Sequence, residues 1–257
     1  MRALLMTALL AGLTAVGQAE VLSGLCMVSA SHNKDAAEVV FRGGECGEDG
    51  RKCSLSNSSN IAWSRWTGVS SDALKQEGAQ LNGRMHGEPG DLTCSGTVRD
   101  GVLAGRYEFA PDPVFLQKMA AMGFNEITPS KQEGFLLLDV STAWAQQIKD
   151  AGVTELTTDR LMGLRALGVD QSYIHAMAVA GYPELRAGKL TEMRAVGVTP
   201  DRAREAKSLG FQPTAEELIQ MCVFKIDRPF VERMRARGLT DLTLAKLIKI
   251  KVFKLED

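Results

Sequence analysis

The chain has 257 residues, of which 45% are hydrophobic, and its formal net charge is −1 at pH 7. This length accommodates two modest domains, and the apolar fraction is ordinary for a protein that buries a core. A chain so close to neutral lacks the overall positive field that favours nucleic-acid binding. Residues 225–257 are locally basic, with nine Lys and Arg against five Asp and Glu, a pattern typical of a solvated helix face.

The first 19 residues have the pattern of a secretory signal peptide. Arg2 precedes an apolar stretch at residues 3–16, and Gly17-Gln18-Ala19 places small residues where signal peptidase cleaves. The stretch is too short to span a bilayer comfortably, and no other segment of the sequence approaches that length. We therefore predict a signal peptide at residues 1–19 and a periplasmic or secreted protein. Export argues against a nucleic-acid partner, and no stable membrane insertion is expected after cleavage.

Residues 20–110 are predicted to form a small antiparallel β domain. Short β-rich runs alternate with turn signals, first at residues 21–30 and 37–41 and later at residues 80–86, 93–98 and 103–109. Asp100-Gly101 suits a two-residue hairpin turn between the last two runs, because both residues tolerate a positive φ. Glycines inside these runs predict strands that approach one another closely.

Trp63 and Trp66 are candidate binding residues of this domain. Residues three apart cannot both face one side of a regular strand, so we expect one ring in the core and the other partly exposed. Core or edge packing is the favoured interpretation. A platform for a sugar or a protein partner is the alternative.

Four of the five cysteines lie in the β domain, namely Cys26, Cys46, Cys53 and Cys94. In an exported protein they predict two disulfides, for which three pairings exist. We favour Cys46–Cys53 across a short loop, which leaves Cys26–Cys94. A four-thiolate zinc site is the alternative, although the C-x-x-C pairs of such sites are absent. Cys222, in the second half, is expected to be a buried small hydrophobe rather than a reactive thiol.

From about residue 124 the sequence nearly repeats itself every 29 residues. Two series of glycines mark the register: Gly123, Gly152, Gly181, Gly210 and Gly238, and then Gly168 and Gly197. Apolar residues at helical spacing, N-caps such as Thr199-Pro200 and a closing glycine predict two short helices in each unit. Asp139, Lys225 and Lys254 replace the first-helix glycine in the end units.

Helices of two to three turns are not stable alone in water, so the units must share their apolar faces. We therefore predict that residues 111–257 form helical-hairpin repeats in a solenoid-like array. The expected fold class is multidomain α+β, with the small antiparallel β domain followed by this array.

The repeats contain a motif that is seen twice in full. In one unit, Leu161 is followed by Leu164-Arg165 and then by Gly168-Val169. In the next unit, Leu190 is followed by Met193-Arg194 and then by Gly197-Val198. This motif, with the segment at residues 96–113, resembles bacterial exported repeat segments that are appended to BlaR-like antirepressor membrane metallopeptidases or occur as stand-alone periplasmic proteins. The resemblance implies the repeat architecture. The peptidase part is absent, because the sequence has no H-E-x-x-H motif, so peptidase activity is not implied.

No motif in the sequence indicates catalysis. His32, His86 and His175 have no His, Cys or Asp partner at ligand spacing on a shared element, and neither a G-x-S-x-G motif nor a phosphate loop is present. We therefore predict no catalytic residues, no metal and no cofactor. An active site assembled from residues far apart in the sequence is the alternative interpretation.

Stacked repeats usually hold partners, so the favoured function is a non-catalytic periplasmic adaptor or scaffold that binds a protein or peptide of the envelope. Arg165, Arg194 and Lys251 occupy equivalent repeat positions and are candidate binding residues, with solvated helix surface as the alternative. A second hypothesis is a regulatory or sensor component of envelope stress or drug-resistance signalling, which rests on the resemblance alone. A third is a hydrolase of envelope polymers that uses the tryptophans and scattered carboxylates of the β domain.

Overall fold

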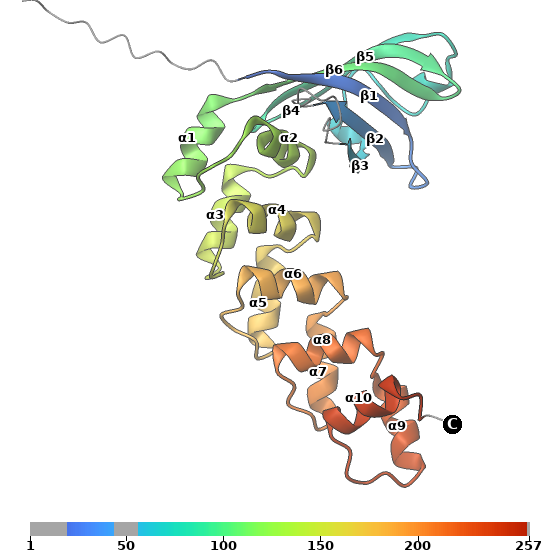
Figure 1. Ribbon diagram of the computed structural model, residues 1–257, viewed down its shortest axis with the longest axis vertical. Coiled ribbons are helices and arrows are strands. Elements are labelled where there is room, and N and C mark those ends of the chain that lie inside the picture. Colours follow the sequence, from blue (N-terminus) through green and yellow to red (C-terminus); the bar gives the residue numbers. More distant parts are fainter. Residues whose placement is uncertain (1–19, 44–55, 256–257) are drawn as a thin grey trace, which may run out of the picture.

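The computed structural model of the protein describes residues 20–43 and 56–255. Within these residues a six-stranded antiparallel sheet is followed by ten α-helices, so the protein is of the mixed α+β class (Figure 1). No helix in these ranges is both long and apolar enough to cross a membrane. The predicted signal peptide and the predicted Cys46–Cys53 bond lie outside the described residues.

The strands are β1 (Leu22–Ala30), β2 (Ala36–Gly43), β3 (Ser56–Ala62), β4 (Gln80–Gly87), β5 (Gly90–Arg99) and β6 (Val102–Pro111). They pair in the order β3-β2-β1-β6-β5-β4, and the sheet curves into a half-barrel (Figure 1). The hairpin prediction is confirmed, because Asp100 and Gly101 join β5 to β6 with φ values of 51° and 76°.

Close approach of strands explains the glycines inside them. Gly96 of β5 pairs with Gly105 of β6, and a Cβ at Gly96 would lie 2.7 Å from the Cα of its partner. Gly24 and Gly43 pair in the same way, and a Cβ at either position would meet the ring of Tyr107. Only glycine leaves room for this ring, so the predicted close packing is confirmed.

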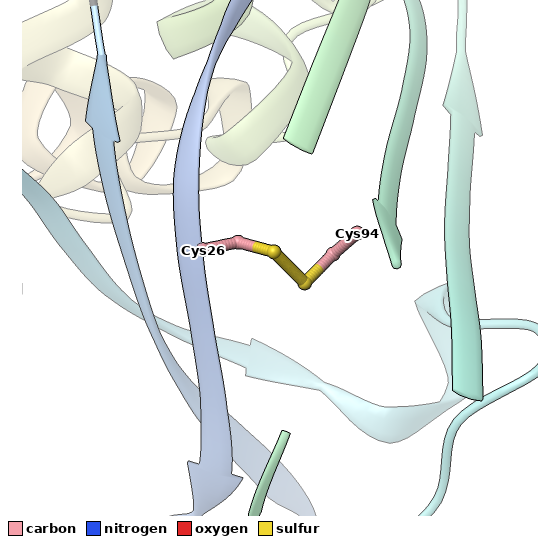
Figure 2. Close-up of a disulfide and its surroundings, with 2 residues drawn as sticks. All are labelled: Cys26 and Cys94. Carbon is pink, nitrogen blue, oxygen red and sulfur yellow. A yellow bond between two sulfur atoms is a disulfide. The ribbon is translucent and has the colours of Figure 1, made fainter. Parts of the chain in front are cut away.

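A disulfide joins Cys26 of β1 to Cys94 of β5 across the buried face of the sheet (Figure 2). Strand β6 lies between the two strands, and the Cα atoms of the two cysteines are 6.1 Å apart. The Cys26–Cys94 pairing is therefore confirmed. The bond also removes two thiols from the alternative zinc site, and the described residues contain no group of side chains that could hold a metal ion. Disulfides persist in oxidising compartments, which agrees with export.

Strand β3 ends at Ala62, and the short 3₁₀-helix η1 (Trp63–Arg65) follows it; a second one, η2 (Ala73–Lys75), precedes β4. Trp66 is buried and Trp63 is only partly buried, as expected for rings three residues apart. Both rings pack with the core of the sheet rather than forming an exposed platform.

The helices are α1 (Pro113–Ala121), α2 (Pro129–Leu137), α3 (Thr142–Asp150), α4 (Thr158–Ala166), α5 (Gln171–Val179), α6 (Ala187–Ala195), α7 (Pro200–Ser208), α8 (Ala215–Val223), α9 (Arg228–Ala236) and α10 (Leu244–Val252). Nearly all of them begin at a Ser, Thr or Asp whose side chain accepts a backbone N–H of the first turn. Thr214 and Glu217 form a capping box at the start of α8. Side-chain caps of this kind make such short helices well defined.

A residue with positive φ follows every helix, as the glycine register predicts. Gly168 and Gly197 have φ values of 64° and 77°, and the residues that replace them elsewhere adopt the same conformation. Asp139 has a φ of 57°, and Lys225 and Lys254 each have a φ of 53°. The backbone conformation after these helices is therefore the same whether or not the residue is glycine.

The helices follow one another away from the sheet in chain order (Figure 1). Contacts join helices two apart: α1 to α3 and α5 to α7 on one side, and α4 to α6, α6 to α8 and α8 to α10 on the other. One continuous apolar cluster runs from Phe115 to Leu247 through them. Helix α2 packs on β3, β5 and β6, so it covers the buried face of the sheet and also begins the helical part.

Candidate functional site

One contact recurs between paired helices along the helical part. The third residue of an odd-numbered helix faces the eighth residue of the next even-numbered helix. The Arg165 guanidinium lies 5.1 Å from the centroid of the Trp144 ring, and Arg194 lies 5.1 Å from that of Tyr173. The Lys251 ammonium lies 4.2 Å from the centroid of the ring of Phe230. Cation–π contacts thus link the two helices of three units.

The unit between them reverses this chemistry. Arg202 stands at the aromatic position of α7, and Cys222 stands at the cation position of α8, where the two side chains are hydrogen-bonded. Burial raises the pKa of the Cys222 thiol, and the nearby Arg202 opposes that effect. The thiol is half-buried and protonated at neutral pH, so the structure favours the predicted small hydrophobe over a reactive nucleophile.

A second contact ties each layer of helices to the previous one. Basic side chains donate to the carbonyl oxygen at the end of the helix two positions earlier: Lys149 to Met122 at 2.7 Å, Arg165 to Leu138 at 3.0 Å, Arg194 to Leu167 at 3.2 Å, Lys207 to Ala180 at 2.6 Å and Arg235 to Leu209 at 2.8 Å. These carbonyls have no partner within their own helix, and they carry the negative end of its dipole. A cation at this place stabilises both helices.

The predicted binding candidates Arg165 and Arg194 therefore have structural contacts. Arg165 also donates to a carboxylate oxygen of Asp139 at 3.0 Å. The two guanidinium groups remain only partly buried, and each lies beside an apolar residue that ends its own helix. The part of each guanidinium group that is exposed to solvent is accessible to a partner.

Large apolar residues end all the even-numbered helices from α2 to α8. We call this set the array rim: Leu138, Leu167, Val196 and Phe224. All four are at least partly exposed, and Val196 is 37% exposed. The contacts from Arg165 and Arg194 bring the ends of α2, α4 and α6 together, so the rim follows one side of the helical part.

A pocket of about 580 Å³ lies between the edge of the sheet and the end of α2. Arg65 forms part of its wall and donates to the carbonyl oxygens of Leu137 at 2.9 Å and Leu136 at 2.6 Å. Arg84 and Asp139 also line it. Arg65 thus holds the end of α2 against the sheet domain, and Asp139, 3.7 Å from Arg65, connects this wall to Arg165 of the helical part.

His86 and Asp91 face each other in the same pocket. They are register partners on β4 and β5, and His86 Nδ1 lies 2.6 Å from Asp91 Oδ1. With a proton on Nδ1, the His86 ring donates a hydrogen bond to the Asp91 carboxylate. Both side chains are well exposed, at 83% and 65%, and Ser64 and Thr67 also line the pocket. The polar side chains that line the pocket are suited to holding a polar ligand.

Glu133 of α2 is buried against the sheet at 2% exposure. It accepts a hydrogen bond from the hydroxyl of Tyr107, and its Oε1 has no partner among the described residues. Burial raises the pKa of Glu133 to about 7, although the Tyr107 hydrogen bond acts in the opposite direction. Burial, with the Glu133 charge, raises the pKa of Tyr107 to about 12. An ionisable group therefore lies at the junction of sheet and helices.

Sequence reasoning missed the His86–Asp91 pair and the burial of Glu133. The first could have been found from the tight connection at residues 87–90, which sets the hairpin register and places His86 opposite Asp91. The second has no signal in the sequence, because it depends on α2 packing on the sheet.

Comparisons of the chain with protein-family models, with curated proteins and with solved structures give no match.

Proposed function

We propose that the protein is a non-catalytic adaptor of the bacterial envelope, in which a solenoid-like array of helical hairpins binds a protein or peptide along the array rim. The observation that supports this proposal is the regular placement of one apolar residue at the end of each even-numbered helix from α2 to α8, with an arginine two residues before it in α4 (Arg165) and in α6 (Arg194). A surface that repeats its chemistry in each layer suits an extended partner.

The spacing indicates what kind of partner fits. Helices in direct contact pack about 8–10 Å apart, so neighbouring rim residues recur at about that distance. A peptide in the polyproline II conformation has three residues per turn and rises about 3.1 Å per residue, so it presents one side chain to the same face about every 9 Å, close to the spacing of the layers. We expect a segment with an apolar side chain at every third position and acidic side chains that complement the arginines.

Site-specific photocrosslinking in the native envelope tests the proposal. A photoreactive residue at Leu167 or at Val196 is expected to capture the same protein. The same residue at His175, which is exposed on α5, is the control position. Identical products from rim and control positions, or none from the rim, would contradict the proposal. The identity of the captured protein also decides whether the adaptor serves a signalling system.

A matched pair of substitutions separates binding from stability. Val196→Asp introduces a charge into the rim, whereas Val179→Asp places it on α5, where the side chain is 70% exposed. We expect the first variant to lose about tenfold or more in affinity for the captured protein, as a charge does in an apolar contact. The control variant should bind like the original chain. Equal loss in both variants would mean that the rim has no special role.

A further inference from the structure

The far end of the helical part is strongly basic. Residues 228–255, which include α9 and α10, contain eight Lys and Arg and only two Asp and Glu, in a chain whose net charge is −1. We call this segment the basic tip. Its two acidic residues already contact cations of the tip, since Asp241 lies 2.8 Å from Lys246 and Glu232 lies 3.8 Å from Arg228. Asp227, Glu256 and Asp257 flank the tip in the sequence, and residues 225–257 still contain nine Lys and Arg against five Asp and Glu, so the net charge of this end is positive.

The basic tip also exposes several large apolar side chains. Val252, Phe253 and Leu255 are 49%, 66% and 64% exposed, and Leu239 is 42% exposed. Lys249 and Lys254 are exposed beside them on and after α10. Phe253 occupies the position that Phe224 occupies in the previous even-numbered helix, where the ring is partly covered. Exposed aromatic and aliphatic side chains among lysines are typical of segments that bind an interface between water and lipid.

A pocket of about 430 Å³ lies at the base of α10. Leu239, Leu242 and Ile250 supply apolar walls, and Lys246, Lys249 and Asp241, the ion-pair partner of Lys246, also line it. Apolar side chains and lysines therefore occur together at both the end and the beginning of α10.

Charge decides between the candidate occupants of this surface. A second copy that met the tip with its own tip would bring two strongly positive surfaces together, which Coulomb repulsion opposes. An anionic phospholipid surface offers negative headgroups for the lysines and an acyl boundary for Phe253 and Leu255. We propose that the basic tip binds the surface of membranes that contain anionic phospholipids. This contact is peripheral, goes beyond the adaptor proposal and leaves the array rim accessible.

Cosedimentation of the purified chain with lipid vesicles tests the proposal. We expect binding to vesicles of phosphatidylcholine and phosphatidylglycerol in equal amounts, and little binding to phosphatidylcholine alone. Binding should fall strongly at about 1 M salt, where the Debye length is about 3 Å. Equal binding to both vesicle types, or no binding to either, would overturn the proposal.

Two tip variants and two controls assign the binding to this surface. Lys249→Gln with Lys254→Gln is expected to weaken vesicle binding about 25-fold, about fivefold for each charge. Phe253→Ser with Leu255→Ser should weaken it at least about tenfold. Lys118→Gln on α1 and Val179→Ser on α5, both at exposed positions, should leave it unchanged.

Thermal unfolding of each variant, followed by circular dichroism, checks that the helical part stays folded. We expect unchanged unfolding, because all substituted side chains are exposed. Vesicle binding that both tip variants leave unchanged would refute the assignment. A concentration-dependent dimer that Phe253→Ser abolishes, without vesicle binding, would assign the tip to a second copy instead. Binding to soluble polyglutamate without vesicle binding would assign it to an acidic protein.

Discussion

Substitution of Arg194 by methionine removes two contacts that join helices of the helical part. The guanidinium Nε donates to the carbonyl oxygen of Leu167 at the end of α4, and the group lies over the ring of Tyr173. Methionine keeps an apolar stem of similar length, so the packing of the side chain along the helix is largely retained. The variant therefore tests the charged end of the side chain.

The expected loss follows from these two contacts. A hydrogen bond from a charged donor to a partly buried carbonyl contributes about 1.5 kcal/mol or more. A partly exposed cation–π contact contributes about 0.5–1 kcal/mol. We therefore expect Arg194→Met to lower the free energy of unfolding by about 2 kcal/mol. Lys118→Met, at an exposed cation on α1, should change it by less than about 0.5 kcal/mol.

Urea denaturation followed by circular dichroism measures both variants. A double-mutant cycle with Tyr173→Leu isolates the cation–π contact, for which we expect a coupling energy of about 0.5–1 kcal/mol. A loss below about 0.5 kcal/mol for Arg194→Met, equal to that of the control, would refute the argument that these cations join the layers. A coupling energy of zero between Arg194 and Tyr173, with a loss of about 2 kcal/mol for Arg194→Met, would assign the whole effect to the hydrogen bond with the Leu167 carbonyl.

Three further predictions concern the rest of the fold. Replacing Cys26 and Cys94 by alanine opens a loop with a sequence separation of 68, and should cost about 4 kcal/mol in chemical denaturation. Because the folded-state pKa of Glu133 is raised to about 7, stability should fall as the pH rises from about 4.5 to 7, by up to about 3 kcal/mol. Glu133→Gln should remove that slope in unfolding curves measured across this range, and an unchanged slope would contradict the burial of the carboxyl group. Gly210→Ala places a Cβ in open space at a φ of 91°, so a loss of about 1 kcal/mol on melting would report backbone strain alone, and no loss would exclude it.

Local chemistry made most of the elements predictable. Caps such as Thr214 with Glu217 and the closing glycines depend on neighbours in the sequence, and so does the turn at Asp100-Gly101. The replacement of glycine by Lys225 was also readable, because the period places it at a position that requires a positive φ.

Contacts between distant elements were not predictable in the same way. Nothing in the residues around Glu133 indicates that α2 packs on the sheet, because burial there depends on the shape of the half-barrel. The contact between Arg202 and Cys222, which occupy the positions of the aromatic residue and of the cation in the other units, depends on how α7 packs beside α8 and could not be read from the sequence. Arg165 and Arg194 were correctly recognised as equivalent positions, but their aromatic and carbonyl partners lie 21 to 27 residues away.

Removal of one whole repeat tests most directly the claim that the helical part is an array of interchangeable units. Deleting residues 182–210 joins Gly181 to Phe211, which stands at the position of Tyr182, and removes α6 and α7 without changing the register. Small-angle X-ray scattering should show a folded protein whose longest dimension is shorter by about 10 Å, one helix layer. Unfolding of the helical part, or an unchanged longest dimension in a folded protein, would contradict the account.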